Sequence, residues 1–384
     1  MAKLGEVFTI ASGGTPDKRN PSYYENGTIP WVKTGDLKNQ YVPAGIECIT
    51  EEGLNNSSAK LFPPNTVLVA MYGATIGACS ILTYEAATNQ ACAAFLPNKN
   101  VLPTYLYYFL SSKREQFVKD GVGGAQPNIS AGYLKNVQFG LIPMQQQIDI
   151  VEKLDKVEKL IVLRKEQLAK LDQLVKSRFI ELFGMPGADD FGWGLMPLGS
   201  ICYINPKKGQ DPRLSSGVEV SFVPMPAVTE RGEIDATAVK EYDEVKTGFT
   251  YFAENDVLFA KITPCMENGK GAVARGLHNG LGFGSTEFHV LRPISGKSNP
   301  YWIYTLTAFS QFREDAASNM TGSAGQRRVP ASFLENYRVA VPPIERQEQF
   351  AAFVEQTDKS KLAIQQSLDK LELLKKSLMQ KYFG

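Results

Sequence analysis

The chain of 384 residues is 43% hydrophobic and 21% charged, which are the proportions of a folded globular protein with sizeable cores. Its 41 basic and 40 acidic residues nearly balance, so overall charge does not indicate a nucleic-acid-binding protein, and any such face must arise from local segregation of charge. No run approaches the roughly 18 apolar residues of a membrane span, and the first residues lack a signal peptide's apolar stretch, so we expect a cytoplasmic location.

Residues with catalytic or metal-binding chemistry are scattered. The five cysteines and two histidines lack the close spacing that metal sites require. The sequence contains no G-x-x-x-x-G-K-S/T phosphate loop, no H-E-x-x-H zinc motif and no G-x-S-x-G elbow with a usable histidine. Asn20-Pro21-Ser22-Tyr23 resembles the N-P-P-Y motif of amino-methyltransferases, but it lacks the second proline and is better interpreted as a turn. We therefore expect no catalytic residues, no metal ion and no cofactor in this chain.

The first candidate contact residues follow an early strand signal. Residues 31–37 are typical of a strand that ends in a polar turn. Lys33 and Thr34 of this turn are candidate binding residues, with side chains suited to phosphates or base edges if the ligand is a nucleic acid. The alternative, a charged turn that is simply solvated surface, is about as common.

Two later loops of the first half carry further candidates. Residues 71–77 form a glycine-punctuated turn that contains Tyr72 and Thr75, for which a plain β-hairpin turn is the stronger alternative. A glycine-rich loop at residues 123–129 contributes Asn128.

Residues 146–183 carry the clearest periodicity of the chain. Apolar residues recur at alternating steps of four and three, the spacing of a coiled-coil seam, and only two arginines interrupt the series. The seam consists of Ile150, Leu154, Val157, Ile161, Arg164, Leu168, Leu171, Val175, Arg178 and Leu182. A helix of this length spans on the order of 57 Å, so it cannot bury its seam within one small domain.

The second half repeats the first. A weaker seam in the same phase lies 200 residues later, and Lys176-Ser177 and Phe183-Gly184 recur as Lys376-Ser377 and Phe383-Gly384. The strand signal before residue 71 likewise recurs before residue 261. The chain is therefore a tandem duplication.

The loops of the second half are richer in polar side chains. Residues 261–270 combine lysines suited to phosphates with side chains able to bind C and A edges, namely Lys261, Thr263, Glu267, Asn268 and Lys270.

A second glycine-rich loop, residues 322–328, adds Arg327 and Arg328, and arginine is the usual reader of guanine. Gln126 and Gln326 stand at matched positions in the two halves. We expect these glutamines to brace the base of each long helix rather than to contact DNA.

These observations predict an α/β (α+β) protein with internal two-fold pseudo-symmetry. Residues 1–145 and 185–343 form two strand-rich domains, and residues 146–184 and 344–384 form a pair of long antiparallel coiled-coil helices. Two globules held apart and related by a two-fold suit a pseudo-symmetric ligand, of which duplex DNA is the commonest.

Taken together, the chain resembles the DNA-specificity subunit of type I restriction-modification systems over essentially its whole length. The alternation of two globules with two long repeat helices carries most of this resemblance. Local matches include Gly73-Ala74-Thr75-Ile76-Gly77, Gly124-Ala125-Gln126-Pro127-Asn128-Ile129 and Ile262-Thr263-Pro264-Cys265-Met266-Glu267-Asn268-Gly269-Lys270. The segment Gly325-Gln326-Arg327-Arg328-Val329 departs from the Gln-Pro-Asn-Ile form of the first half.

The resemblance implies a non-catalytic subunit that takes part in bacterial defence. Each target-recognition domain would read one half of a bipartite, asymmetric DNA target, and the helix pair would set the unread spacer. The long helices would dock two modification subunits, which bind S-adenosylmethionine and methylate adenine. Restriction subunits that use ATP and Mg²⁺ can then join.

Two rival functions remain open at this point. A stand-alone methyltransferase or nuclease would need the cofactor and metal motifs that the sequence lacks. A non-catalytic coiled-coil adaptor that binds protein would need only the heptads. The salt dependence of duplex binding would separate the adaptor from a DNA-binding protein, because phosphate contacts weaken steeply with salt.

Overall fold

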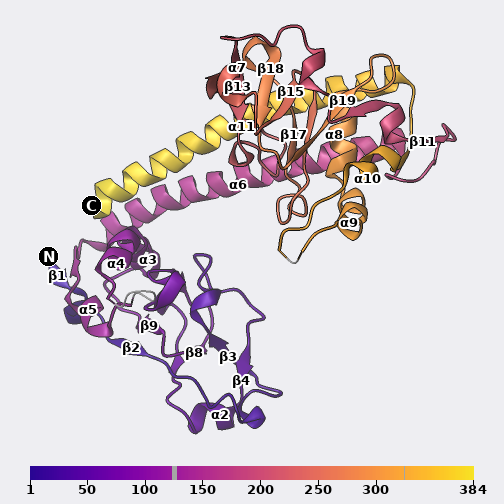
Figure 1. Ribbon diagram of the computed structural model, residues 1–384. Coiled ribbons are helices and arrows are strands. Elements are labelled where there is room, and N and C mark those ends of the chain that lie inside the picture. Colours follow the sequence, from indigo (N-terminus) through magenta and orange to yellow (C-terminus); the bar gives the residue numbers. More distant parts are fainter. Residues whose placement is uncertain (123–127, 324) are drawn as a thin grey trace. The chain divides into compact units, whose positions relative to one another are not determined.

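The computed structural model describes residues 1–122, 128–323 and 325–384, which fall into two compact units. Unit 1 comprises residues 1–165 and 366–384, and unit 2 comprises residues 166–365. Each unit therefore contains one globule and a part of each long helix (Figure 1). Within the described residues, no helix is both long enough and apolar enough to cross a lipid bilayer.

The two long helices are α6 (Met144–Phe183) and α11 (Ile344–Phe383). The first begins two residues before its predicted start at residue 146, and the second begins at its predicted residue 344. A proline stands directly before each start. The Pro143 carbonyl accepts hydrogen bonds from Gln146 and Gln147, and Pro343 does the same for the second helix, so the first turn closes on the proline.

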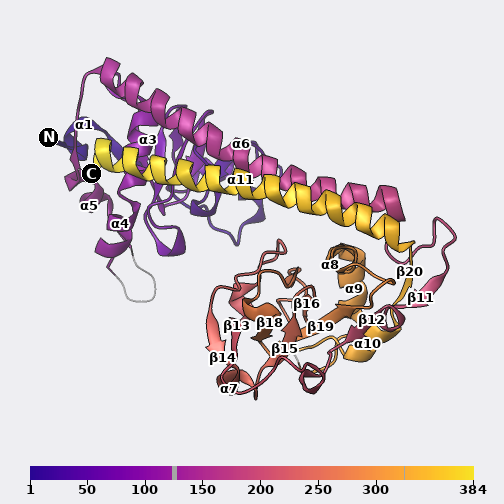
Figure 2. The ribbon, with the colours of Figure 1, turned by 90° about the horizontal axis from the view of Figure 1, so that it is seen from above.

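The long helices lie side by side and run antiparallel, as the heptad pattern predicts (Figures 1 and 2). In unit 1, Lys165 pairs with Glu372 at 2.9 Å, and Glu158 pairs with Lys375 at 2.5 Å. A higher residue number on α6 therefore pairs with a lower residue number on α11, as in two antiparallel helices. Seam positions are buried in both units, with Leu154, Val157 and Ile161 in unit 1 and Leu168 and Val175 in unit 2.

Among its described residues, unit 1 contains two four-stranded sheets and one two-stranded sheet. The first sheet is antiparallel throughout, with the order β2 (Ile10–Ser12), β9 (Cys92–Phe95), β6 (Val67–Ala70) and β7 (Cys79–Ile81). The second is mixed, with β3 parallel to β8, in the order β4 (Cys48–Ile49), β3 (Ile29–Val32), β8 (Ala86–Thr88) and β5 (Leu61–Phe62). The small sheet pairs β1 (Ala2–Lys3) with β10 (Gln138–Phe139).

Unit 2 repeats this topology strand for strand. Its antiparallel sheet has the order β12 (Cys202–Ile204), β19 (Phe288–Pro293), β16 (Val257–Ala260) and β17 (Gly271–Val273). Its mixed sheet has the order β14 (Val239–Glu241), β13 (Glu219–Val223), β18 (Leu281–Gly284) and β15 (Thr250–Ala253), with β13 parallel to β18. The small sheet pairs β11 (Leu195–Pro197) with β20 (Arg338–Ala340). The duplication is therefore confirmed at the level of strand order.

Helices complete each unit. Unit 1 has α3 (Pro103–Ser112), α4 (Arg114–Asp120) and α5 (Ala131–Asn136), with short α1 (Leu4–Val7) and α2 (Glu51–Asn55). Unit 2 has α8 (Pro300–Ala308), α9 (Ser310–Ser318), α10 (Ala331–Asn336) and short α7 (Tyr242–Val245).

Side chains along the central strand of each antiparallel sheet point alternately to its two faces, and each face packs against a different hydrophobic core. In β16, Val257 and Phe259 face the core that includes α8, whereas Leu258 and Ala260 face the core against the mixed sheet. Strand β6 divides its side chains between two cores in the same way. Both faces of β6 and of β16 are buried, so each of these strands is a continuous apolar run in the sequence.

The last residue of each long helix enters the core of a globule. Phe383 is buried in unit 1, with its ring 5.4 Å from that of Tyr105, and Lys113 Nζ donates to its carbonyl at 2.6 Å. Phe183 is buried in unit 2, with its ring 6.5 Å from that of Trp302. The recurrence of phenylalanine at this point in both halves is thus a packing requirement.

A buried glutamine fastens the start of each long helix. The Gln147 side chain accepts from Leu102 N at 2.9 Å and donates to the carbonyls of Asn100 and Ile142, both at 2.9 Å. Gln347 makes the corresponding three bonds in unit 2, with Asn299 N, the Lys297 carbonyl and the Pro342 carbonyl. Both glutamines are fully buried. Each side-chain amide therefore supplies hydrogen-bond partners to buried backbone groups that would otherwise lack them.

Replacing Gln147 by alanine should lower the free energy of unfolding by about 2 to 3 kcal/mol, because three backbone groups lose their partner. Urea unfolding followed by circular dichroism measures the loss. Gln146→Ala is the matched control, since Gln146 is exposed and adjacent, and it should change stability by less than about 0.5 kcal/mol. Equal effects of the two substitutions would contradict the fastening role of Gln147.

Candidate nucleic-acid interface

Three segments of unit 2 that are far apart in sequence meet at one end of its sheets. We call residues 261–270, 285–287, 321–323 and 325–329 the second loop cluster. Backbone hydrogen bonds join them: Lys261 N donates to the Glu287 carbonyl at 2.9 Å, and Val329 N donates to the Lys261 carbonyl at 2.9 Å. Thr263 N donates to the Arg327 carbonyl at 3.1 Å. The predicted residues of the two loops therefore lie on one surface.

Charged side chains gather in the second loop cluster. Arg328 binds the Glu287 carboxylate through Nε at 2.9 Å and Nη2 at 2.8 Å, and these bonds hold the pKa of Glu287 below its usual value. Arg327 Nη2 lies 3.4 Å from Glu267 Oε1. Partial burial lowers the pKa of Lys261. The cluster thus contains two carboxylates and four cations, Lys270 included, which leaves a local excess of positive charge in a chain of nearly neutral composition.

Two of the predicted contact residues also shape the loop itself. Thr263 Oγ1 donates to the Gly325 carbonyl at 3.2 Å, and Lys270 Nζ reaches the Met225 carbonyl at 3.5 Å. Glu267 and Asn268 are exposed. The loop therefore presents Glu267 and Asn268 outward, while Thr263 and Lys270 tie it to neighbouring segments.

Sequence reasoning missed the residue that anchors this loop. Arg313 of α9 is only 6% exposed, and its guanidinium donates to the carbonyls of Met266 at 3.0 Å and Gly269 at 3.4 Å. The same group lies 4.4 Å from the centre of the Phe259 ring. Burial lowers the pKa of Arg313 to about 10. An arginine in a polar helix looks like surface in the sequence, so only the tertiary structure identifies its role.

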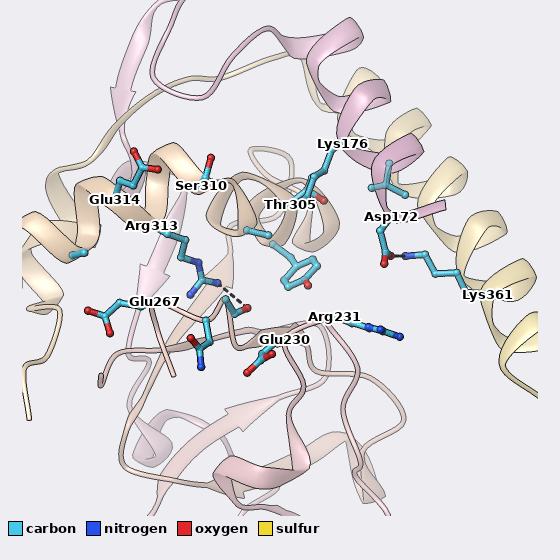
Figure 3. Close-up of a pocket in the computed structure, with 16 residues that line it drawn as sticks. Asp172, Lys176, Glu230, Arg231, Glu267, Thr305, Ser310, Arg313, Glu314 and Lys361 are labelled. Carbon is cyan, nitrogen blue, oxygen red and sulfur yellow. Dashed lines mark hydrogen bonds and ion pairs between the residues drawn. The ribbon is translucent and has the colours of Figure 1, made fainter. Parts of the chain in front are cut away.

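A cavity of about 460 Å³ lies beside the anchored loop (Figure 3). Glu267 and Asn268 line one part of it, and the ion pair of Asp172 with Lys361, at 2.7 Å, lies on the long helices of the same unit. Figure 3 shows Arg313 pointing from α9 toward the loop that carries Glu267. The exposed end of the loop thus borders a hollow lined by charged groups of both signs.

Unit 1 brings its candidates together in the same way. Asn128 forms isolated bridges with Tyr72 and Val122, and Thr75 Oγ1 donates to the Tyr72 carbonyl at 3.3 Å. Tyr72 is 45% exposed, and Asn128 is also exposed. We call residues 71–77, 88–91 and 128–130 the first loop cluster.

The two clusters differ in size and charge. Eight residues separate Ala70 from Cys79 in unit 1, whereas ten separate Ala260 from Gly271 in unit 2. Tyr72, Thr75 and Asn128 are uncharged, in contrast to the cations and carboxylates of the second cluster.

Lys33 and Thr34 lie beside the first loop cluster. Asn89 N of that cluster donates to the Val32 carbonyl at the end of β3, directly before Lys33, at 3.0 Å. The Lys33 ammonium is paired with the Glu47 carboxylate, and this bond raises the pKa of Lys33. Thr34 opens a short 3-10 helix, residues 34–36. Lys33 therefore contributes a neutralised charge to this surface.

The sequence predicts a bracing role for the loop glutamines Gln126 and Gln326. Gln126 lies outside the described residues. Gln326 is exposed, and its backbone carbonyl accepts from Arg328 Nη1 at 3.1 Å. The side chains seen to fasten the long helices are Gln147 and Gln347, whose buried amides bind backbone groups next to each helix start. They also stand 200 residues apart, which is the signal that could have found them.

Within the described parts of the chain, no three histidine, cysteine, aspartate or glutamate side chains lie where they could hold a metal ion. Cys79, Cys92 and Cys202 are buried, and burial raises the pKa of each thiol to about 12. Such thiols stay protonated and are poor nucleophiles. The geometry here supports binding, through exposed polar side chains on anchored loops.

A buried histidine ties the second loop cluster to the sheet and gives unit 2 a pH dependence. His289 Nε2 lies 2.8 Å from the Val329 carbonyl, and Nδ1 lies 3.0 Å from Asn205 Nδ2, so the neutral ring donates to Val329 and accepts from Asn205. Burial lowers the pKa of His289 below 6.5. The unfolded chain therefore takes up a proton first on acidification, and stability falls as the pH drops through 6.5.

We expect the thermal midpoint of unit 2 to fall between pH 7.5 and pH 5.5 in the natural chain. His289→Gln, which keeps a donor for the Val329 carbonyl, should lose most of this decrease. Scanning calorimetry at the two pH values tests the expectation. If the thermal midpoint of the variant decreases by the same amount, the pH dependence comes from groups other than His289.

Replacing Arg313 by methionine should loosen the 261–270 loop. The amides of Asn268, Gly269 and Lys270 are bonded within that loop, and their hydrogen exchange should accelerate about tenfold or more once two anchoring bonds are lost. Arg338→Met is the control, because Arg338 is exposed on β20. Unchanged exchange in Arg313→Met would show that the loop does not need the anchor.

Comparisons with known proteins identify the family of this chain. Residues 1–173 and 191–373 match the family model described as the type I restriction modification DNA specificity domain. The specificity subunit of the type I restriction enzyme EcoEI from Escherichia coli is 45% identical over 154 residues, which are 40% of this chain and 25% of that subunit. The matched part thus spans a quarter of the length of this curated relative.

Two solved structures share the fold along the whole chain. One is a chain from a study of complex assembly and conformational transition of the type I restriction-modification system, with a TM-score of 0.58, 19% identity, and coverage of 100% of this chain and 96% of that one. The other is the type I restriction-modification S subunit from M. genitalium, with a TM-score of 0.53, 14% identity, and coverage of 100% and 95%. Since its two matched segments take in most of its length, the chain belongs to the type I restriction-modification DNA specificity domain family.

Proposed function

We propose that this chain is the DNA-specificity subunit of a type I restriction-modification complex. The observation that carries the proposal is the repetition of one loop cluster, with different side chains, in two units of identical strand order. A protein that reads two different half-sites needs this combination of a common frame and unlike contact surfaces. Membership of the specificity domain family supports the same function.

Each loop cluster reads one half of a bipartite, asymmetric duplex target. In the first, Tyr72, Thr75 and Asn128 provide uncharged contacts, with Lys33 and Thr34 beside them. The second offers Lys261, Lys270 and Arg327 for phosphates, and Glu267, Asn268 and Arg328 for base edges. Thr263 contacts DNA next to them. Because the two sets share no pattern of donors and acceptors, the two half-sites differ in sequence.

The long helices set the unread spacer and dock the modification subunits. Each has 40 residues and spans about 60 Å, so it acts as a ruler for the two half-sites. Leu163, Leu362 and Leu373 are exposed on these helices by 43%, 61% and 68%. Apolar side chains displayed in this way support a protein partner, here two modification subunits.

The partners supply the chemistry. Modification subunits bring S-adenosylmethionine and methylate adenine, and restriction subunits bring the ATP- and Mg²⁺-dependent steps. This chain takes part by binding DNA and placing the target base, without a cofactor of its own.

Base-resolution methylation mapping tests the proposal. DNA from cells that express this chain with its neighbouring modification subunit should carry methyladenine in a split motif with a fixed gap, and only when this chain is present. Methylation at a short contiguous motif would contradict the proposal that each unit binds a separate half-site. No methylation from a stable complex would favour the protein adaptor instead.

Matched deletions test the ruler. Removing one heptad from the middle of each long helix, residues 165–171 and 365–371, should change the gap by at least one base pair and leave both half-sites unchanged. The two deletions stand at equivalent positions of the repeat, so they keep the seam in phase. Deleting residues 165–171 alone puts the facing helices out of register and is expected to abolish assembly. An unchanged gap in the matched variant would refute the ruler.

A further inference from the structure

Arg328 stands out because its side chain is both oriented and accessible. Its Nε and Nη2 donate to the Glu287 carboxylate at 2.9 and 2.8 Å, and its Nη1 donates to the Gln326 carbonyl at 3.1 Å. The side chain nevertheless remains 41% exposed. A guanidinium has five N–H donors, so within the described residues two remain available for a ligand.

The two remaining donors form one edge of the guanidinium. The carboxylate occupies the Nε/Nη2 edge, so the edge that faces a ligand is the one formed by Nη1 and the second N–H of Nη2, and Nη1 keeps one N–H beside its bond to Gln326. Two parallel N–H groups of this kind match the O6 and N7 acceptors that guanine presents in the major groove.

The backbone of Arg328 is fixed as firmly as its side chain. Arg328 N donates to the Thr321 carbonyl at 2.8 Å, Thr321 N donates back at 3.0 Å, and Arg328 also forms a bridge with Ile262. An oriented side chain loses little conformational entropy on binding, which favours base-specific recognition.

Glu287 is placed to orient Arg328. It lies between β18 and β19, where its N–H donates to Ser285 Oγ at 3.2 Å and its carbonyl accepts from Lys261 N at 2.9 Å. Its side chain is 26% exposed and is committed to Arg328. The neighbouring Arg327 has a different arrangement, since it makes one contact of 3.4 Å with Glu267 and is 45% exposed. Arg327 is therefore suited to a mobile phosphate contact.

The same position differs between the two units. Asn128 bridges Tyr72 and Val122 as Arg328 bridges Ile262 and Thr321, so the two residues are structural equivalents 200 residues apart. Asparagine matches the adenine edge and arginine the guanine edge. The common frame thus presents a different reading group in each unit.

We propose that Arg328 reads a guanine in the half-site of unit 2, and that Glu287 is the positioning residue that presents its guanidinium. This inference rests on the proposed function. It adds the identity of one target base, and it separates Arg328 from its neighbour Arg327.

The test uses the full chain assembled with its modification subunits and the target that methylation mapping defines. Binding is measured by competition with duplexes in which each base pair of both half-sites is replaced in turn. Arg328→Ala should reduce the preference for one guanine in one half-site by about 5- to 150-fold, the range of a bidentate contact, and leave the other positions unchanged. Arg328→Lys keeps the charge without the fork, so it should lose the same preference and retain overall affinity.

Variants of Glu287 test the positioning role. Glu287→Gln should weaken preference at the same guanine, whereas Glu287→Asp, which keeps the carboxylate, should restore part of it. Arg327→Ala should lower affinity for all sequences alike, and Arg338→Ala on the same unit should change neither affinity nor preference. A selective effect of Glu287→Gln at that one guanine supports positioning, and an effect spread over both half-sites contradicts it.

Three results would overturn the inference. The half-site of unit 2 could contain no guanine, Arg328→Ala and Arg328→Lys could leave every base preference intact, or both could weaken binding uniformly, as loss of a phosphate contact does. Each of these leaves the proposed function standing if the natural chain directs a split motif. Absence of a split motif in the natural complex would instead refute the proposed function.

Discussion

Each unit of this protein depends on apolar helix surface that the helix cannot bury by itself. A 40-residue helix with a continuous seam is stable only when other elements cover that seam, and here the antiparallel partner and the globule cores share the task. Phe183 and Phe383 are the extreme cases, since the final residue of each long helix is buried in a globule. Helix and globule therefore form one cooperative structure within each unit. The buried amides of Gln147 and Gln347 fasten the opposite ends of the helices in the same way.

A rigid base of this kind allows the loops to vary. The strand order and the alternation along β6 and β16 are the same in both units, whereas the loops after these strands differ in length and charge. Arg313 anchors the longer loop of unit 2 from below by binding its carbonyls, so the anchor places few demands on the loop's exposed side chains. Recognition surfaces can then change without disturbing the frame, which suits a protein whose task we propose to be target selection.

Charge on the proposed DNA-binding surface is local and partly neutralised by ion pairs. Glu287 engages Arg328, and Glu47 engages Lys33, so cations that face solvent are partly neutralised before any ligand binds. Such pairing lowers indiscriminate attraction to phosphates and leaves directional hydrogen bonding as the larger contribution to specificity. It also explains why a chain with nearly equal numbers of acids and bases can be proposed to bind DNA.

The sequence by itself determined the duplication, the two long helices and their antiparallel pairing, and the loops that carry candidate contacts, because periodicity and repeated residues are local signals. It placed helix braces at Gln126, which lies outside the described residues, and at the exposed Gln326, and it gave no sign of the buried Gln147 and Gln347, of Arg313 or of the role of Glu287. Those assignments depend on burial and on contacts between segments tens of residues apart, as when Glu287 meets Arg328 across 41 positions. Only the tertiary structure decided them, because hydrogen-bond partners and solvent exposure arise when the chain folds and have no counterpart in residue spacing.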